Sequence, residues 1–216
     1  MVELNSFLLE QFQKGGPVMW PLLLCSLLGL TFTLERYWVL SWVPRERRAR
    51  AQAQAWVDEL GRLPPSELLT AVAARRGLLA TIYAAVLRKH LAFIEEGVPP
   101  TDQQAELARE ADQSCREYLG QYLPLLSTIG SLSTLLGLLG TITGMIKAFN
   151  AIAKSGTGDP NTVAAGIAEA LITTAAGLFI AIPVVASHRY LAVKAGRILR
   201  RLEMPVHALD RALTRS

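Results

Sequence analysis

Hydrophobic residues along the 216-residue chain gather into three long runs that are almost free of charge. Residues 17–34 form a run of 18 without a charged residue, and residues 123–146 form another of 24. Residues 163–187 form a third run of 25, in which Glu169 is the single charged residue. A helix needs about 20 apolar residues to cross the hydrocarbon core of a bilayer. The pattern therefore predicts three transmembrane helices.

The first run is short for a membrane helix. It lengthens to residues 17–43 if Glu35 and Arg36 lie at the interface and the stretch YWVLSWV that follows acts as an aromatic anchor. A secretory signal peptide is the competing interpretation, and it requires a basic N-terminus and a small-residue cleavage site. The first ten residues instead contain Glu3 and Glu10, which favours a membrane span.

The segment between the first two runs, residues 44–120, also has a helical pattern. It is rich in Ala and Leu and lacks the alternation that is typical of strands. Proline pairs at residues 64–65 and 99–100 divide it, because proline interrupts helices. A helical stripe then extends from Leu107 to Tyr122 without a break. We therefore expect one continuous helix that leads from this segment into the second span.

The C-terminal tail, residues 189–216, repeats this amphipathic pattern. Its apolar residues follow one another at intervals of three or four: Leu191, Ala195, Ile198, Leu202, Val206, Leu209 and Leu213. The third span should continue into the tail as one long helix, bent at Pro205. The stripe would then pack on the helices of residues 44–120 or on another subunit.

The predicted fold class is an all-α integral membrane protein with three transmembrane helices and long cytoplasmic helical extensions. The spans are assigned to residues 17–43, 121–153 and 162–188. Lysine and arginine gather after the first and third spans, at Arg45, Arg47, Arg48, Arg50, Arg189, Lys194, Arg197, Arg200 and Arg201.

Cytoplasmic loops of membrane proteins carry an excess of lysine and arginine. The distribution therefore predicts that the N-terminal segment, residues 1–16, and the loop at residues 154–161 lie outside. Residues 44–120 and the tail at residues 189–216 should lie in the cytoplasm.

The composition of the chain is typical of a membrane protein and argues against several other classes of protein. The chain is 51% hydrophobic but 7% aromatic. Its net charge is +4, and the positions of its basic residues bear on membrane topology more than on nucleic-acid binding. Cys25 and Cys115 are expected to be unpaired thiols in a reducing compartment. His90, His188 and His207 are scattered, and no phosphate-binding loop or metal-ligand spacing is present. We therefore expect no catalytic residue, no metal and no cofactor.

Small and hydroxyl residues form one face of each of the last two spans. In the second span this face comprises Ser127, Gly130, Thr134, Gly137, Thr141, Gly144 and Ala148. In the third span it comprises Gly166, Ala170, Thr174, Gly177 and Ala181. Small residues allow membrane helices to approach closely. The glycines are therefore interpreted as a helix-packing face: Gly130, Gly137, Gly144, Gly166 and Gly177.

Close packing does not explain a carboxylate inside a span, which costs roughly 2.5–3.5 kcal/mol on insertion scales. Glu169 lies about 9 Å of helical rise past Val163, so hydration just below the outer interface is one interpretation. The other is a polar lane that holds water or an ion through hydroxyl groups. Its residues would be Glu169, Thr173 and Thr174 from the third span and Thr134 and Thr141 from the second. Three spans cannot enclose a pore, but a ring of subunits with these faces inward could.

Two segments carry a resemblance to a known family. GLLGTITGMIKAF at residues 137–149 and GIAEALITTAAGLFIAIP at residues 166–183 closely resemble signature segments of the ExbB/TolQ/MotA proton-channel family. With ERYWVL at residues 35–40, they are most similar to the ExbB and TolQ branch. Three spans fit that branch, whereas the flagellar stator members have four.

The resemblance implies a pentameric ring in the bacterial inner membrane, around single transmembrane helices of an ExbD- or TolR-like partner, whose helix carries an aspartate. The family's pore threonines correspond to Thr141 and Thr174, and its third-span glutamate corresponds to Glu169. Inward proton flow would move the partner and act on a TonB- or TolA-like protein. Lys147, near the outer end of the second span, is interpreted as a snorkelling residue or as one that tunes ion entry.

The resemblance implies an ExbB-like subunit of a TonB-type system. A TolQ-like subunit for outer-membrane integrity and cell division is one alternative. Another is a non-conducting scaffold for a single-span partner. A self-contained transporter is disfavoured because the spans show no internal repeat.

Overall fold

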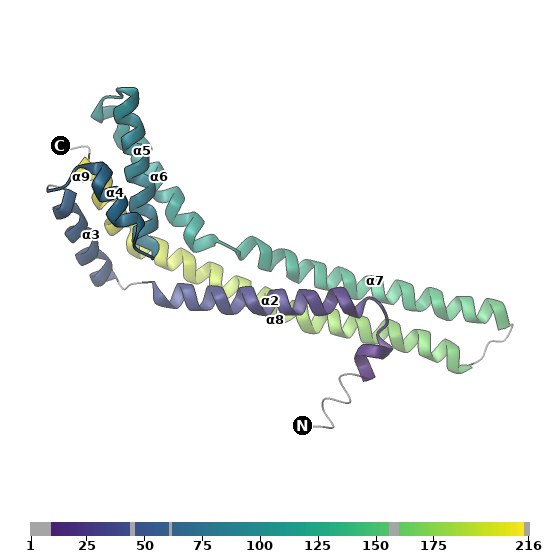
Figure 1. Ribbon diagram of the computed structural model, residues 1–216. Coiled ribbons are helices and arrows are strands. Elements are labelled where there is room, and N and C mark those ends of the chain that lie inside the picture. The colour runs from purple at the N-terminus through teal and green to yellow at the C-terminus, as the bar shows by residue number, and fades with distance from the viewer. Residues whose placement is uncertain (1–9, 44–45, 61, 156–159, 214–216) are drawn as a thin grey trace. The chain divides into compact units, whose positions relative to one another are not determined.

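The computed structural model describes residues 10–43, 46–60, 62–155 and 160–213, and these residues are helical without a strand. The helices in chain order are α2 (Met19–Trp42), α3 (Glu46–Leu60), α4 (Pro65–Ala73), α5 (Leu78–Glu96), α6 (Pro100–Gly120), α7 (Leu123–Ser155), α8 (Pro160–Val206) and α9 (Ala208–Leu213) (Figure 1). The chain divides into two compact units. The span unit comprises residues 1–36 and 122–190, and the extension unit comprises residues 37–121 and 191–216.

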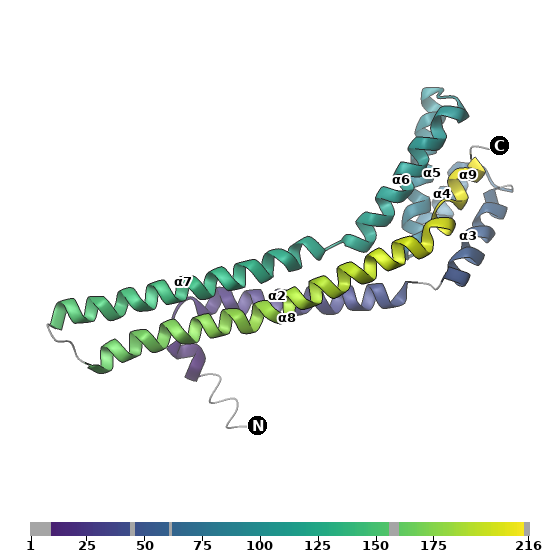
Figure 2. The same ribbon diagram turned by 180° about the vertical axis from the view of Figure 1, so that it is seen from behind.

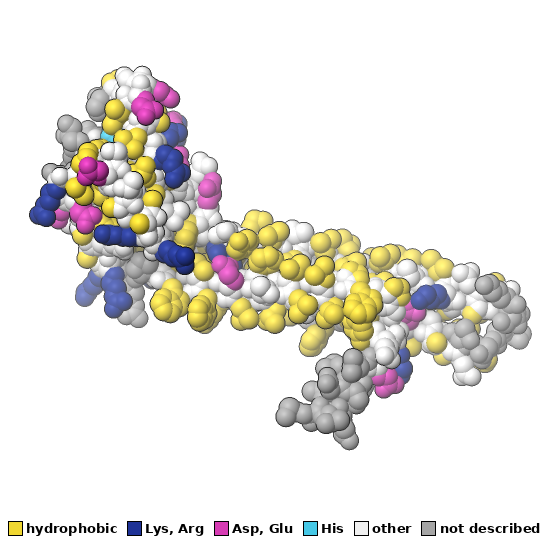
Figure 3. Space-filling model, viewed as in Figure 1, with side chains coloured by type: hydrophobic (Ala, Val, Ile, Leu, Met, Phe, Trp, Pro, Cys, Tyr) yellow, Lys and Arg dark blue, Asp and Glu magenta, His cyan; other side chains and the backbone are white. Residues whose placement is uncertain are grey.

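Three helices within the described residues are long and apolar enough to cross a membrane, and they contain the three hydrophobic runs. This confirms the predicted all-α fold with three candidate spans. In the span unit α2, α7 and α8 run side by side in both views (Figures 1 and 2). Hydrophobic side chains cover much of the surface along α2 and α7, whereas charged side chains gather on the extension unit (Figure 3). The exposed apolar surface of the spans fits contact with lipid.

The helix expected to run unbroken into the second span is interrupted, so that prediction was wrong. Helix α6 ends at Gly120 and α7 begins at Leu123. Tyr122 between them has φ 63°, a left-handed backbone conformation that residues other than glycine rarely adopt. Its ring stacks on Phe32 at 5.0 Å and lies 5.1 Å from the Arg36 guanidinium. These contacts with α2 offset the roughly 1–2 kcal/mol that the left-handed backbone costs.

The proline pairs begin helices in addition to separating them. Helices α4 and α6 start at the second proline of each pair, and the first proline is extended. Proline suits the first helical position because the amide proton it lacks has no partner there in any helix. At the other end of α5, Gly97 has φ 70° and Val98 N–H donates to the Phe93 carbonyl at 3.0 Å. This left-handed glycine closes the helix.

The extension unit has a core of large side chains. The rings of Trp56 and Tyr83 meet edge to face at 5.2 Å, and both residues are almost completely buried. The Tyr83 hydroxyl donates a hydrogen bond to the Pro205 carbonyl at 2.7 Å, which joins α5 to the end of α8. Helix α9 packs against α3, α5 and α6.

The predicted tail stripe is confirmed as a buried face, because all seven of its residues belong to the core. The third span continues into the tail as one helix, α8, as expected, and α9 follows it within the tail. The helix ends at Val206, one residue after the proline at which a bend was predicted.

Candidate functional site

Helices α7 and α8 contact each other through their glycines. A Cβ added to Gly177 would lie 2.6 Å from the Ser133 carbonyl oxygen and 2.9 Å from the Gly137 Cα. A Cβ on Gly144 would lie 2.8 Å from the Gly166 carbonyl oxygen, and one on Gly166 would lie 2.9 Å from the carbonyl oxygen of Gly144. Real Cβ atoms do not approach so closely. The two backbones are therefore in direct contact, and no larger residue fits at these positions.

Two further glycines of α7 pack against side chains of α8. A Cβ on Gly130 would lie 2.6 Å from a methyl group of Val185. One on Gly140 would collide with the side chain of Thr173. The glycine contacts thus extend along α7 from residue 130 to residue 144. They fix the antiparallel register of the two helices and so decide which polar side chains meet.

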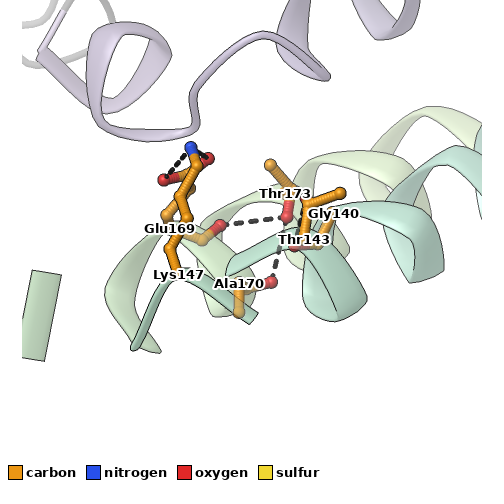
Figure 4. A network of polar contacts seen from close by, with 6 residues as sticks. All are labelled: Gly140, Thr143, Lys147, Glu169, Ala170 and Thr173. Atoms are coloured by element: carbon orange, nitrogen blue, oxygen red, sulfur yellow. Dashed lines mark hydrogen bonds and ion pairs between the residues drawn. The ribbon is translucent and has the colours of Figure 1, made fainter. Parts of the chain in front are cut away.

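Thr173 is packed between the two helices. It has no exposed surface, and its hydroxyl lies 2.9 Å from the Glu169 carbonyl oxygen and 3.0 Å from that of Ala170 (Figure 4). The hydroxyl of a threonine in a helix commonly donates a hydrogen bond to the backbone carbonyl one turn earlier in the same helix. Within one chain Thr173 therefore faces α7, and its hydroxyl is satisfied by its own helix.

Thr141 of α7 and Thr174 of α8 lie side by side and are half-buried. Their hydroxyl oxygens are 3.5 Å apart. Thr141 donates to the Leu138 carbonyl at 2.6 Å, and the Thr174 hydroxyl lies 3.0 Å from the Gly137 carbonyl across the helix contact. Each hydroxyl oxygen keeps acceptor capacity after it donates its proton. This pair is the one place where α7 and α8 bring two of the predicted threonines together.

Thr134 lies elsewhere on α7, about two turns before Thr141. It is exposed, and its hydroxyl donates to the Gly130 carbonyl of its own helix at 3.1 Å. This hydrogen bond stays within α7 and does not reach the other predicted threonines. The structure thus groups Thr141 with Thr174, and it holds Thr173 against Gly140 and leaves Thr134 on the surface of the described chain.

Glu169 forms an ion pair with Lys147 of α7. The Lys147 ammonium nitrogen lies 2.5 Å from one carboxylate oxygen and 2.8 Å from the other (Figure 4). The Glu169 side chain is 13% exposed, whereas that of Lys147 is 52% exposed. The carboxylate that raised the question of a polar lane therefore has a cation beside it, supplied by the same chain.

The loop before α2 lies against the carboxylate of this ion pair. Gly16 has φ 68°, and a Cβ there would collide with the Glu169 carboxylate. Figure 4 shows the pair facing the loop that precedes α2. Glycine is required at this position for two reasons, since it tolerates the left-handed backbone and leaves room for the carboxylate.

The ion pair is the contact that the sequence analysis missed. Lys147 and Glu169 lie at nearly equal distances along the chain from the loop that joins α7 to α8. In an antiparallel helix pair such residues come to the same depth, and opposite charges at one depth are a detectable signal. No group of three His, Cys, Asp or Glu residues that could hold a metal ion occurs in the described part of the chain.

Three apolar helices, two of them in backbone contact with polar side chains between them, define a multi-pass helical membrane protein. The chain belongs to the MotA/TolQ/ExbB proton channel family, whose model matches residues 75–204. The family resemblance found in the two signature segments is thereby confirmed. The matched range includes part of the segment that precedes the second span.

Individual relatives carry both branch names. The chain is 38% identical over 181 residues to the biopolymer transport protein ExbB-like 1 of Synechocystis sp., and this match covers 81% of this chain and 66% of the relative. It is 34% identical over 203 residues to the biopolymer transport protein exbB1 of Vibrio cholerae, covering 90% and 84%. It is 40% identical over 97 residues to the Tol-Pal system protein TolQ of Pseudomonas aeruginosa, covering 45% and 42%.

Proposed function

We propose that this chain is the proton-channel subunit of an inner-membrane motor that couples the proton motive force to a TonB-type system. The adjacent hydroxyls of Thr141 and Thr174, 3.5 Å apart inside two candidate spans, carry the proposal. The names of the relatives favour the ExbB branch, because those matched over 81% and 90% of this chain are ExbB proteins. The TolQ match covers 45%.

The proposal includes assembly as a homopentamer around the transmembrane helix of an ExbD- or TolR-like partner. One chain uses its glycine face for the contact between α7 and α8, so a lane bounded on all sides requires more copies. The half-exposed threonine pair of each copy would face the ring axis. The partner's aspartate would carry the proton, and a TonB- or TolA-like protein would receive the motion.

Each element of the lane has a distinct role in this proposal. The hydroxyls of Thr141 and Thr174 accept and donate hydrogen bonds to water or to the partner's carboxylate. Glu169 lies at the outer mouth, and Thr134 continues the lane along α7. One proton crossing the membrane releases about 2.3 kcal/mol per 100 mV of potential. That amount biases a conformational step, so work at a distance requires repeated cycles.

The proposed topology places residues 1–16 and the loop at residues 154–161 in the periplasm. Residues 44–120 and 189–216 would lie in the cytoplasm, on the side where basic residues accumulate. The proposed spans remain residues 17–43, 121–153 and 162–188, with Tyr122 near the inner end of the second. The lane then conducts protons from the periplasmic mouth toward the cytoplasm.

A TolQ-like role is the second candidate, favoured by a specific observation. Two proteins named TolQ are 40% and 43% identical to this chain over 97 and 82 residues. Because relatives of both names match this chain, the same family of subunits serves either system. The two roles differ in the downstream protein and therefore in the cellular process that is restored.

The test is complementation of hosts that lack either ExbB-type or TolQ-type activity, with the chain and its single-span partner supplied together. We expect energy-dependent uptake to be restored and envelope integrity to remain defective. The double variant Thr141→Val, Thr174→Val keeps the shape but removes both hydroxyls, and it should lose uptake while assembling normally. Native mass measurement in mild detergent should give five copies of the chain.

Three results would contradict the proposal. Normal uptake by the double threonine variant would mean that the hydroxyls serve helix packing, as in a non-conducting scaffold. Restoration of envelope integrity alone would assign the TolQ-like role. A chain that stays monomeric at high concentration would exclude the ring.

A further inference from the structure

We propose that Lys147 and Glu169 act as one fixed, net-neutral ion pair that joins α7 to α8 at the outer mouth throughout the transport cycle. Glu169 is then a positioning residue that holds the two helices together there, and it does not carry protons itself. This inference rests on the proposed proton-channel function.

The geometry of the pair supports a fixed contact between the two helices. The Lys147 nitrogen contacts both carboxylate oxygens, at 2.5 Å and 2.8 Å. Charge-assisted contacts of this kind are among the stronger hydrogen bonds in proteins. Lys147 is 52% exposed while Glu169 is 13% exposed, so the long lysine side chain brings its charge to a carboxylate that water reaches poorly.

The surroundings of the carboxylate leave little room for proton exchange. The loop before α2 passes so close that a Cβ on Gly16 would collide with a carboxylate oxygen. A proton carrier needs a path to water on one side and an acceptor on the other. The Glu169 carboxylate instead lies against Lys147 of α7 and faces the loop before α2 (Figure 4).

No hydrogen-bonded route among the described residues joins the carboxylate to the threonine pair. Thr173 is one turn from Glu169, but its hydroxyl lies next to the carbonyl oxygens of Glu169 and Ala170, at 2.9 Å and 3.0 Å. The same hydroxyl is packed against Gly140 and has no exposed surface. Among the described residues the Glu169 carboxylate therefore contacts Lys147 and not the threonine pair, which favours a fixed ion pair over a proton relay.

The decisive experiment removes the two charges separately and together. Glu169→Gln and Lys147→Met each leave one charge without its partner, and we expect uptake to fall at least about tenfold in each, because each change breaks the contact and leaves the other charge unpaired. The double variant Lys147→Met, Glu169→Gln contains no charge at this site. We expect it to recover uptake to within about threefold of the wild type, since the couple acts as a unit.

A double variant no more active than Glu169→Gln overturns the inference, because the loss would then come from the missing Glu169 carboxylate and not from the broken pair. Near-normal uptake in both single variants also overturns it, because the pair would then be idle. If the wild-type chain itself supports no proton-driven uptake, the proposed function fails instead. The two failures are therefore distinguishable.

A second measurement keeps the test valid if the single variants assemble poorly. The thermal unfolding midpoint of the detergent-purified chain should fall in each single variant and rise again in the double variant, and additive losses would contradict a coupled pair. The matched control is Lys14 with Glu10, a pair at 2.6 Å whose side chains are 54% and 58% exposed. The double variant Lys14→Met, Glu10→Gln should change uptake by less than about twofold.

Discussion

The two units of the chain pack their helices by opposite means. In the span unit α7 and α8 meet at glycines, which have no side chain, and the backbones of Gly177 and Gly137 are in direct contact. In the extension unit the helices meet through large buried side chains, including Trp56, Tyr83 and Leu68. The same chain thus uses backbone contact in one region and side-chain volume in the other.

The difference follows from the solvent around each unit. In water, burial of apolar area stabilises a fold by about 25 cal/mol per Å², so large side chains contribute most. In a bilayer lipid tails already surround apolar side chains, and burial of a leucine gains little. Close van der Waals packing and hydrogen bonds then hold helices together, and glycine allows the shortest approach. The contact between α7 and α8 fits the second environment, and the core of the extension unit fits the first.

Enlarging a glycine at the helix contact should have the largest effect. Gly177→Leu requires α7 and α8 to separate, because even a Cβ there would lie 2.6 Å from the Ser133 carbonyl oxygen. We expect loss of the assembled complex and of uptake. Gly177→Ala, a smaller overpacking, should cost roughly 1–3 kcal/mol. Both are measured by native mass and by thermal unfolding in detergent.

The control for this change lies on the same helix. A Cβ on Gly196 would have no neighbour within 4 Å, so Gly196→Ala should be neutral or stabilise α8 by about 0.5–1 kcal/mol. Equal destabilisation by alanine at residues 177 and 196 would show that helix propensity, and not close backbone contact, decides the outcome.

Truncating the core of the extension unit should have a smaller and more local effect. Trp56 is 1% exposed and contacts Tyr83, so Trp56→Ala should lower the unfolding free energy by about 3–5 kcal/mol. Because the two units are held by different forces, the three spans should stay helical and inserted. Limited proteolysis and circular dichroism measure the two effects separately.

An exposed tryptophan of the same unit is the matched control. Trp42 is 78% exposed, and Trp42→Ala leaves no cavity, so it should stay within about 0.5 kcal/mol of the wild type. If Trp56→Ala also expels the spans from the membrane, the two units do not unfold independently and the comparison fails.

The features that the sequence predicts correctly are those set by local pattern. Charge-free runs predict the three candidate spans, and spacing of three and four predicts the buried tail stripe that ends at Leu213. The break at Tyr122 could not be found in this way, because contacts with Phe32 and Arg36, remote in sequence, hold its left-handed backbone. Local pattern alone favours a continuous helix there.

The candidate site shows the same division. The sequence identifies Thr141 and Thr174 as polar residues of the small faces, but their adjacency depends on the register of two helices. That register is set by glycine contacts that extend over several helical turns. The register also decides which residue lies beside Glu169. The sequence therefore shows Lys147 as a basic residue of the span but does not show that it pairs with Glu169.

The smallest expected effect concerns the one thiol in the extension unit. Cys115 is completely buried, and burial, followed by the nearby charge of Asp112, raises the pKa of its thiol to about 11 from 9.0. At pH 8 the thiolate, which is the reactive form, is then roughly a hundredfold scarcer than for an ordinary cysteine. In a Cys25→Ser background, labelling of Cys115 by a water-soluble maleimide should therefore be slow. The rate should keep rising as the pH passes 9 and 10, because the folded thiol ionises only near pH 11.

Adding Trp56→Ala, which opens the core of this unit alone, should accelerate labelling at pH 8, whereas Gly177→Leu in the span unit should not. A labelling rate that levels off near pH 9, or one that responds to the glycine change and not to the tryptophan change, would contradict the division of the chain into two independently packed units.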